Sequence, residues 1–159
     1  MSQTTFAVPK DKQDVTVLLN GGKSLQGAIF LEYTPAELSI HHRIAAFLED
    51  GNLFFPLVLK TGSTELIHKR NVKLIELAFR PDQEDLKRVF SLMHQIRISA
   101  VFTDEQTING IAIAEVPEEK ARLSDILNLP AKFLNVKVDH AVCYINKDAI
   151  RKVLYAPGK

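Results

Sequence analysis

The sequence predicts a mainly β protein of the α+β class, built from two tandem β-barrel-like units of five strands, each with an inserted helix. The first observation is a nonapeptide pattern, Ile67–Ile75, that returns as Ile145–Val153 with matching apolar, lysine and β-branched positions. The second is a series of short apolar and β-branched runs separated by turn signals. The third is one stretch of helical periodicity in each half of the chain.

The repeat extends beyond the nonapeptide. Other segments match in the same order, and the spacing between partners shortens only from 83 residues to 79, and to 78 at the nonapeptide. They are Val15–Ile29 with Ile98–Ala112, Arg43–Leu48 with Arg122–Leu127, and Phe54–Leu57 with Phe133–Val136. Because internal repeats mark repeated structural units, we predict a first repeat over residues 14–79, a connecting helix within 80–94 and a second repeat over 95–157.

Composition indicates a soluble globular protein. The 159 residues are 46% hydrophobic and 25% charged, which is typical of a folded domain. The net charge of +1 provides no long-range attraction for nucleic acid or acidic lipid. Cys143 is the only cysteine, which rules out an internal disulfide, and no apolar run reaches the ~20 residues that span a bilayer. We therefore expect a cytoplasmic protein with no membrane partner.

The first repeat opens with a predicted hairpin. Val15–Leu19 and Leu25–Leu31 are apolar runs on either side of Asn20-Gly21-Gly22. An Asn-Gly pair between such runs favours a tight turn that needs positive φ. Gly27 lies inside the second strand and predicts a bulge or a sharp bend there.

A helix is expected next in each repeat. Thr34-Pro35-Ala36-Glu37 combines a good N-cap, a proline at the first helical position and the glutamate of a capping box. Asp50-Gly51-Asn52 should end this helix. In the second repeat, Pro117 should start the helix. The apolar faces are formed by Leu38, Ile44, Phe47 and Leu48 in the first helix and by Leu123, Ile126 and Leu127 in the second.

Further strands complete each repeat. A tight kink at Lys69-Arg70-Asn71 should precede the last strand of the first repeat. Pro56 cannot donate a ladder hydrogen bond, so its strand should be an edge or bulged there, and that edge should be blocked. Leu86, Val89, Phe90 and Met93 have helical spacing and predict the connecting helix over 82–93. The remaining expected strands are 53–59, 65–68, 72–77, 96–102, 107–114, 133–138, 141–145 and 150–154.

These units resemble the Sm and Sm-like (LSm) family, including its bacterial Hfq form. Gly22-x-x-Leu25-x-Gly27-x-Ile29 is similar to the first motif of the family, and Ile108-x-Gly110 keeps part of it. Ile145–Ile150 looks like the second motif in its Hfq form, and Ile67–Val72 looks like the version that ends in Asn-Val. The resemblance implies a bacterial protein of unknown function with five-stranded barrel units, and it makes RNA a candidate partner.

No catalytic, metal or cofactor site is predicted. Gly21-Gly22-Lys23-Ser24 echoes a phosphate-binding loop, but a strand follows it where that motif requires a helix. His41 and His42 are adjacent and point different ways on a helix, unlike a zinc-binding pair four residues apart. Asp139-His140 near Cys143 has the elements of a metal corner, and a turn beside a buried thiol is the favoured alternative.

Basic residues concentrate at the repeated kink, and they are the candidate nucleic-acid-binding residues: Lys69, Arg70, Lys73, Lys147, Arg151 and Lys152. A phosphate-contacting rim is one interpretation. Solvated turns with charged strand edges are the favoured alternative, because no stacking aromatic residues alternate with these cations. Asp148 also places a negative charge beside Lys147. RNA is therefore a candidate partner but not the favoured one, and we expect weak or absent RNA binding at physiological salt.

Three functions follow from these observations. The first is a non-catalytic assembly or regulatory module that self-associates through edge strands or through packing of the repeats. The second is a nucleic-acid-binding protein that uses the basic turns. The third and least favoured is a small-ligand-binding protein or enzyme with a site between the repeats, lined by His68, His140 and carboxylates.

Overall fold

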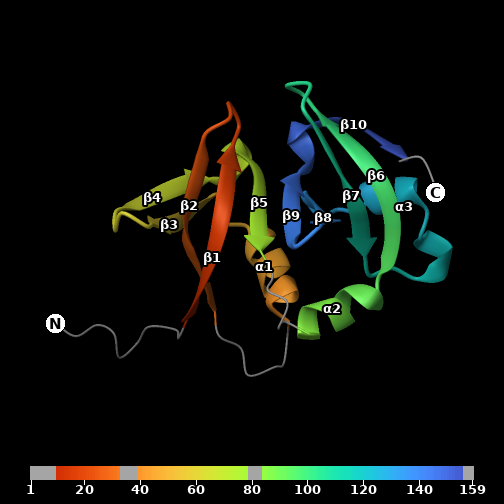
Figure 1. Cartoon of the computed structure of the whole chain (residues 1–159), viewed down its shortest axis with the longest axis horizontal. Helices are drawn as coiled ribbons and strands as arrows, with labels where there is room; N and C mark the ends of the chain where they lie inside the picture. The colour runs from red at the N-terminus through yellow and green to blue at the C-terminus, as the bar shows by residue number, and fades with distance from the viewer. Residues whose placement is uncertain (1–9, 33–38, 79–83, 156–159) are drawn as a thin grey trace.

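The computed structural model describes residues 10–32, 39–78 and 84–155, which form one antiparallel sheet of ten strands with three short α-helices (Figure 1). The strands are β1 Lys10–Leu19, β2 Ser24–Glu32, β3 Phe54–Leu59, β4 Thr64–His68, β5 Val72–Ala78, β6 His94–Phe102, β7 Thr107–Ala114, β8 Phe133–Val138, β9 Ala141–Asn146 and β10 Ile150–Tyr155. The helices are α1 Ile40–Leu48, α2 Glu84–Ser91 and α3 Leu123–Leu127. Short 3-10 turns lie at η2 Lys69–Asn71, η3 Glu118–Lys120 and η4 Lys147–Ala149.

The strand order is β10-β6-β7-β8-β9-β5-β1-β2-β3-β4, so each half of the chain contributes five neighbouring strands. In both halves the fifth strand pairs with the first: β5 with β1, and β10 with β6. β5 also pairs with β9, and this contact joins the two halves (Figure 1). The sheet is not closed, because β4 and β10 end the strand order. The predicted barrel-like closure is therefore absent from the hydrogen-bonded sheet of the described residues.

The hairpin between β1 and β2 forms as predicted. Gly21 and Gly22 have φ of 97° and 99°, values that favour glycine. Leu19 N donates to Lys23 O at 2.8 Å and closes the turn. In the matching turn of the second half, Glu105 takes the place of the second glycine with φ of 76°.

Gly27 and Gly110 allow the third strand of each half to approach the second strand closely. A Cβ atom on Gly27 would lie 2.5 Å from Val58 O, and one on Gly110 would lie 2.7 Å from Lys137 O. Real side chains do not tolerate such distances to backbone atoms. The glycine in the middle of β2 therefore has a steric cause, and β7 in the second half repeats it. The register between β1 and β2 shows no bulge at Gly27.

The helices differ from prediction at their starts. Ser39 caps α1, accepting a hydrogen bond from His42 N, and the predicted Thr34–Glu37 capping box lies outside the described residues. The predicted helix start at Pro117 is wrong, because Pro117 precedes the 3-10 turn η3 and α3 begins only at Leu123. The connecting helix is α2, and Pro81-Asp82 also lies outside the described residues.

Pro56 has a neighbouring strand on one side only. β3 pairs with β2 through Leu59 and Val58 alone, whereas Pro56 itself lies opposite Leu66 of β4. The predicted local edge at Pro56 is confirmed. The outer edge of this half is β4, however, whose sequence contains no proline. Pro56 therefore does not block the open edge of the sheet.

The hydrophobic cores cross the boundary between the halves. The first core contains mainly residues of the first half, but Val142 and Tyr144 of β9 belong to it. The second core contains Leu74 of β5. Helix α2 contributes Leu86 and Phe90 to the first core. Because each core includes residues of the other half, we expect the halves to unfold together.

Candidate functional site

The repeated kink has the same local geometry in both halves. His68 Nδ1 accepts a hydrogen bond from Arg70 N at 3.0 Å, and Asn146 Oδ1 accepts one from Asp148 N at 2.9 Å. These side chains cap the 3-10 turns η2 and η4. The turn then redirects the chain from the fourth strand of each half into the fifth.

Lys69 points back to the C-terminal end of α1. Its Nζ donates to Phe47 O at 2.9 Å and pairs with Asp50 Oδ1 at 2.7 Å. A lysine in this place satisfies carbonyl groups that the helix end leaves free. Burial acts to raise the pKa of Asp50, but hydrogen bonds from Lys69 and Asn52 outweigh it and lower that pKa below its usual value. Lys69 is therefore already engaged within the fold.

Lys147 has the corresponding role in the second half. Its Nζ donates to Leu129 O at 2.9 Å, just beyond the end of α3. Burial lowers the pKa of Lys147, and the negative charge of Glu49 partly opposes that shift. The lysine that opens each 3-10 turn thus binds the end of the preceding helical segment.

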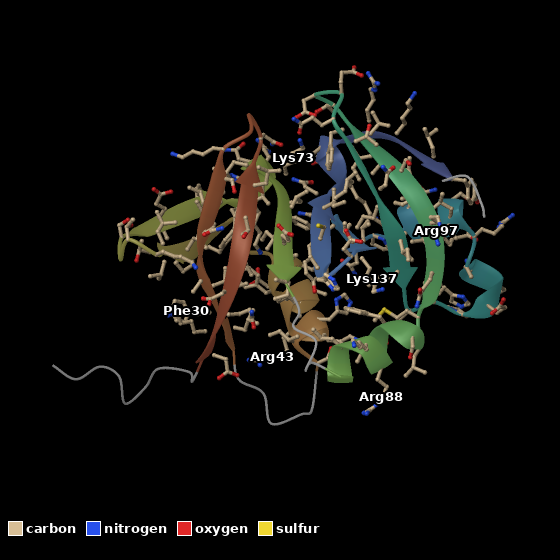
Figure 2. All side chains as sticks on the ribbon, in the orientation of Figure 1. Phe30, Arg43, Lys73, Arg88, Arg97 and Lys137 are labelled. Carbon is tan, nitrogen blue, oxygen red and sulfur yellow. The ribbon has the colours of Figure 1, made fainter. Side chains whose placement is uncertain are left out.

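Lys73 is buried at the junction of the halves, where Figure 2 labels it. Its side chain is 3% exposed, and Nζ donates to Asp104 at 2.8 Å and to Gln106 at 2.7 Å. Nζ also lies 4.3 Å from the centre of the Phe102 ring. This lysine fastens β5 to the turn between β6 and β7. It is not available to a phosphate group.

Three predicted basic residues remain more exposed. Arg151 of β10 forms an ion pair with Glu105 in the turn between β6 and β7, with Nη2 and Oε1 2.9 Å apart. Lys152 is exposed on β10, at the edge of the sheet. Arg70 is exposed, and its carbonyl accepts a weak hydrogen bond from Asn146 Nδ2 at 3.4 Å.

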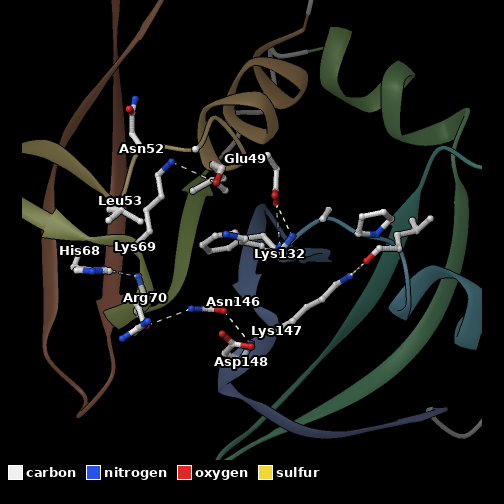
Figure 3. Close-up of a pocket in the computed structure, with 16 residues that line it drawn as sticks. Glu49, Asn52, Leu53, His68, Lys69, Arg70, Lys132, Asn146, Lys147 and Asp148 are labelled. Carbon is white, nitrogen blue, oxygen red and sulfur yellow. Dashed lines mark hydrogen bonds between the residues drawn. The ribbon is translucent and has the colours of Figure 1, made fainter.

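A cavity of about 520 Å³ lies between the two kinks (Figure 3). It brings together Lys69, Arg70 and Lys147 from the predicted set, and it adds Lys132. The other predicted residues, Lys73, Arg151 and Lys152, do not line it. Apolar side chains from the segments before β3 and β8 form part of its wall. The structure thus divides the six predicted cations between a pocket, a buried junction and an outer strand.

Glu49 spans this pocket region and was not predicted from the sequence. Its Oε2 accepts hydrogen bonds from Lys132 N at 2.8 Å and Phe133 N at 3.2 Å (Figure 3). The bond ties the end of α1 to the start of β8. Glu49 and Lys132 precede the third strands of the two halves. The sequence repeat identified these strands but gave no signal for the two charged residues or for the contact between them.

A second polar cluster lies where α1 meets the second half. His41 is buried, and its Nδ1 lies 2.9 Å from Tyr144 Oη. Burial and the neighbouring His42 lower the pKa of His41 to about 4, and Glu115 opposes them. His41 is therefore neutral at physiological pH and serves as a buried hydrogen-bonding partner.

Ser39, His42 and Glu115 form a line of hydrogen bonds beside that pair. Ser39 Oγ lies 2.8 Å from His42 Nδ1, and His42 Nε2 lies 3.0 Å from Glu115 Oε1. This order resembles a nucleophile, base and acid. Ser39 Oγ also accepts the His42 amide at 3.2 Å, so the hydroxyl is committed to capping α1. These hydrogen bonds connect α1 to the segment after β7, and this structural role explains the arrangement.

Within residues 10–32, 39–78 and 84–155, no group of three or more His, Cys, Asp and Glu side chains is placed to hold a metal ion. Cys143 is buried in β9, and burial raises the pKa of its thiol to about 12. The thiol therefore stays protonated, which makes it a poor metal ligand.

Both edges of the sheet expose apolar side chains. Leu66 of β4 is 70% exposed, and Leu154 and Tyr155 of β10 are 47% and 66% exposed. In β9, Tyr144 takes the place of Leu66 and is fully buried, with its ring stacked on His41 of α1. An exposed strand with apolar side chains is a template for pairing with another chain.

None of the described helices is long and apolar enough to cross a membrane. Comparison of the chain with protein-family models, with curated proteins and with solved structures gave no match.

Proposed function

We propose that this chain is a non-catalytic assembly module, built from two divergent Sm-like repeats, that associates with further copies of itself through β4 and β10. The pairing of β5 with β9 carries the proposal, because it joins the two halves into one sheet. β4 is the fourth strand of its half, as β9 is, and β10 is the fifth strand of its half, as β5 is. β4 and β10 stand at the two ends of the strand order. β10 of one copy can therefore pair with β4 of the next as β5 pairs with β9.

Matching contacts support the proposal that the halves are copies of one unit. Lys69 N donates to Leu53 O at 2.8 Å, and Lys147 N donates to Lys132 O at 3.0 Å. Both bonds connect the 3-10 turn to the residue before the third strand. Strand order, the mid-strand glycine and the helix-end lysine also recur at matching positions. These matching contacts favour duplication of one unit over chance similarity of two β-rich halves.

The exposed side chains supply the driving force for association. Leu66 is 70% exposed, while Tyr144, its counterpart in β9, is fully buried and contacts His41 of α1. Burial of one leucine side chain contributes roughly 1.5–3 kcal/mol. Leu154 and Tyr155 offer more apolar surface on the opposite edge. Pairing of the edges would place Leu66 and Tyr155 on one face of the joined sheet and satisfy the free backbone groups.

The test is the mass of the protein in solution as a function of its concentration. We expect species heavier than the 17.8 kDa chain, in an equilibrium that Leu66→Lys shifts to the monomer. Leu92→Lys is the matched control, because Leu92 is 81% exposed but lies after α2, away from both edges. A wild-type protein that stays at 17.8 kDa at the highest concentration reached would refute the proposal.

Nucleic-acid binding is the second candidate, and the pocket between the kinks favours it. Arg70 and Lys132 line that pocket, and within the described residues neither side chain has an ion-pair partner. Lys69, Lys73 and Arg151 are engaged by carboxylates, which leaves few cations for phosphate. We therefore expect weak or absent binding of single-stranded RNA at physiological salt.

A salt titration tests this candidate. Each phosphate contact lowers the slope of log K against log salt by ~0.7 on a single strand. If the pocket binds RNA, Arg70→Ala with Lys132→Ala should reduce that slope by up to about 1.4. These exposed residues are better targets than Lys69 and Lys147, whose loss would also free helix-end carbonyls. Tight, salt-sensitive binding that the double variant abolishes would favour this candidate over the assembly module.

A further inference from the structure

The internal β5–β9 junction specifies how two copies would meet. We propose that copies join in the register that sets Val153 of one copy opposite Leu66 of the next, with His68 bonding across the junction. This inference rests on the proposed self-association and adds its register and its specificity residue. In the internal junction Ile75 lies opposite Tyr144. Val153 and Leu66 occupy the matching positions of the second and first halves.

The register places compatible side chains together. Ile75 and Tyr144 are both fully buried inside the chain. On the same face, Leu77 lies opposite Val142, and their counterparts at the edges are Tyr155 and Thr64. The exposed Leu66 and Tyr155 would thus lie on the face that the internal junction buries. A shift of one residue would place them on opposite faces of the sheet.

His68 is the polar contact of this junction. Asn146 holds its place in β9, where Oδ1 caps the 3-10 turn and Nδ2 donates across the junction to Val72 O at 3.0 Å. His68 Nδ1 already accepts the Arg70 amide, so the neutral ring carries its proton on Nε2. The Nε2–H group of His68 therefore corresponds to the Nδ2–H group of Asn146 in the internal junction. Its acceptor in the next copy is the carbonyl of Ile150, the counterpart of Val72.

One internal contact has no equivalent between copies. Lys73 forms an ion pair with Asp104, but the residue of the first half that aligns with Asp104 is Gly21, which has no charge. Arg151, the counterpart of Lys73, pairs with Glu105 of its own chain. The junction between copies therefore lacks the ion pair of the internal junction, in which Lys73 is buried and Asp104 is 46% exposed. We expect it to be weaker and reversible.

Disulfide trapping tests the register. Directly opposed residues in antiparallel strands have Cα atoms about 4.5–5.5 Å apart, which is within the range that a disulfide can bridge. Leu66→Cys with Val153→Cys should give chain-to-chain disulfides under mild oxidation. Leu66→Cys with Leu154→Cys is the control, because Leu154 points to the other face. Cys143 is buried and is kept in all variants.

The outcomes separate the register from the assembly itself. Efficient trapping by the Val153 pair alone supports the proposed register. Equal trapping by both pairs, or by the Leu154 pair alone, overturns the register while leaving self-association intact. Heavy species in solution with no trapping by either pair would place the contact elsewhere and also overturn the register. A strictly monomeric protein would overturn both proposals.

Substitutions of His68 test its role as a specificity residue. His68→Leu removes both the turn cap and the N–H donor, and it should weaken self-association by roughly two- to tenfold. His68→Asn restores the chemistry of β9 and should associate like the wild type. The melting temperature of each variant at low concentration reports the loss of the cap alone. If His68→Leu and His68→Asn associate equally, His68 makes no bond across the junction.

Discussion

The buried histidine of α1 predicts a specific loss of stability in mild acid. His41 is 3% exposed and lies 2.9 Å from the hydroxyl of Tyr144. Burial, reinforced by the charge of His42, lowers its pKa from 6.5 to about 4. In the unfolded chain the same imidazole takes up a proton near its ordinary pKa. Acid therefore favours the unfolded state, because that state binds the proton first.

The two pKa values set the size and range of the effect. The contribution of neutral His41 is fully present above pH 6.5, falls as the pH drops toward 4, and is lost below that. Between pH 7 and pH 5 the wild type should lose about 2 kcal/mol of unfolding free energy through this residue. His41→Gln cannot take up the proton. Its stability should therefore fall by about 2 kcal/mol less over the same interval.

Urea unfolding followed by circular dichroism measures this difference. Wild type, His41→Gln and His140→Gln are unfolded at pH 7 and pH 5, and the change in unfolding free energy is compared within each protein. His140 lies exposed in the turn before β9, so His140→Gln should follow the wild type. If His41→Gln loses as much stability as the wild type, His41 is not buried in the neutral form and the reasoning fails.

Three further predictions concern stability. Gly27→Ala should destabilise the fold by roughly 1–3 kcal/mol, because its Cβ would lie 2.5 Å from Val58 O; chemical denaturation measures the loss. Lys69→Met should cost about 1 kcal/mol through loss of the bonds at the end of α1, and hydrogen exchange should rise first in that helix. Asn146→Ala should cost roughly 1–3 kcal/mol by leaving the buried Val72 carbonyl without its side-chain donor, which thermal unfolding would detect.

The strands were the most predictable part of the fold. Turn chemistry at Asn20-Gly21-Gly22 and the period of the apolar residues indicated the strand positions. The observed bounds agree with those expected within two residues, except that β1 begins at Lys10 and not at Val15. The start at Pro117 was wrong because a proline favours the first turn of any helical segment, including a 3-10 turn. Local signals therefore predicted where secondary structure lies better than whether a helical segment is an α-helix or a 3-10 turn.

The pairing of the halves was not predictable from local signals. The contact between His41 and Tyr144 joins residues far apart in the sequence, and no periodicity marks it. Repeat alignment places Tyr144 at the position of Leu66, but only the strand order shows that β9 has β5 as a neighbour where β4 has no described strand. The sequence pattern of a strand therefore does not determine whether that strand becomes an outer edge of the sheet.

The lysines at the repeated kinks have a structural explanation, which agrees with the sequence-based preference for solvated turns over an RNA-binding rim. A cation beside a helix end is stabilised by the free carbonyls there. Lys69 uses its ammonium group in this way, and Lys147 donates to Leu129 O just beyond the end of α3. Their recurrence is therefore explained by the geometry of the unit, without a phosphate ligand. Lys73 differs, since its bond to Asp104 exists only where one half meets the other. Lys73 thus stabilises the junction between the two halves of the sheet, again without a phosphate ligand.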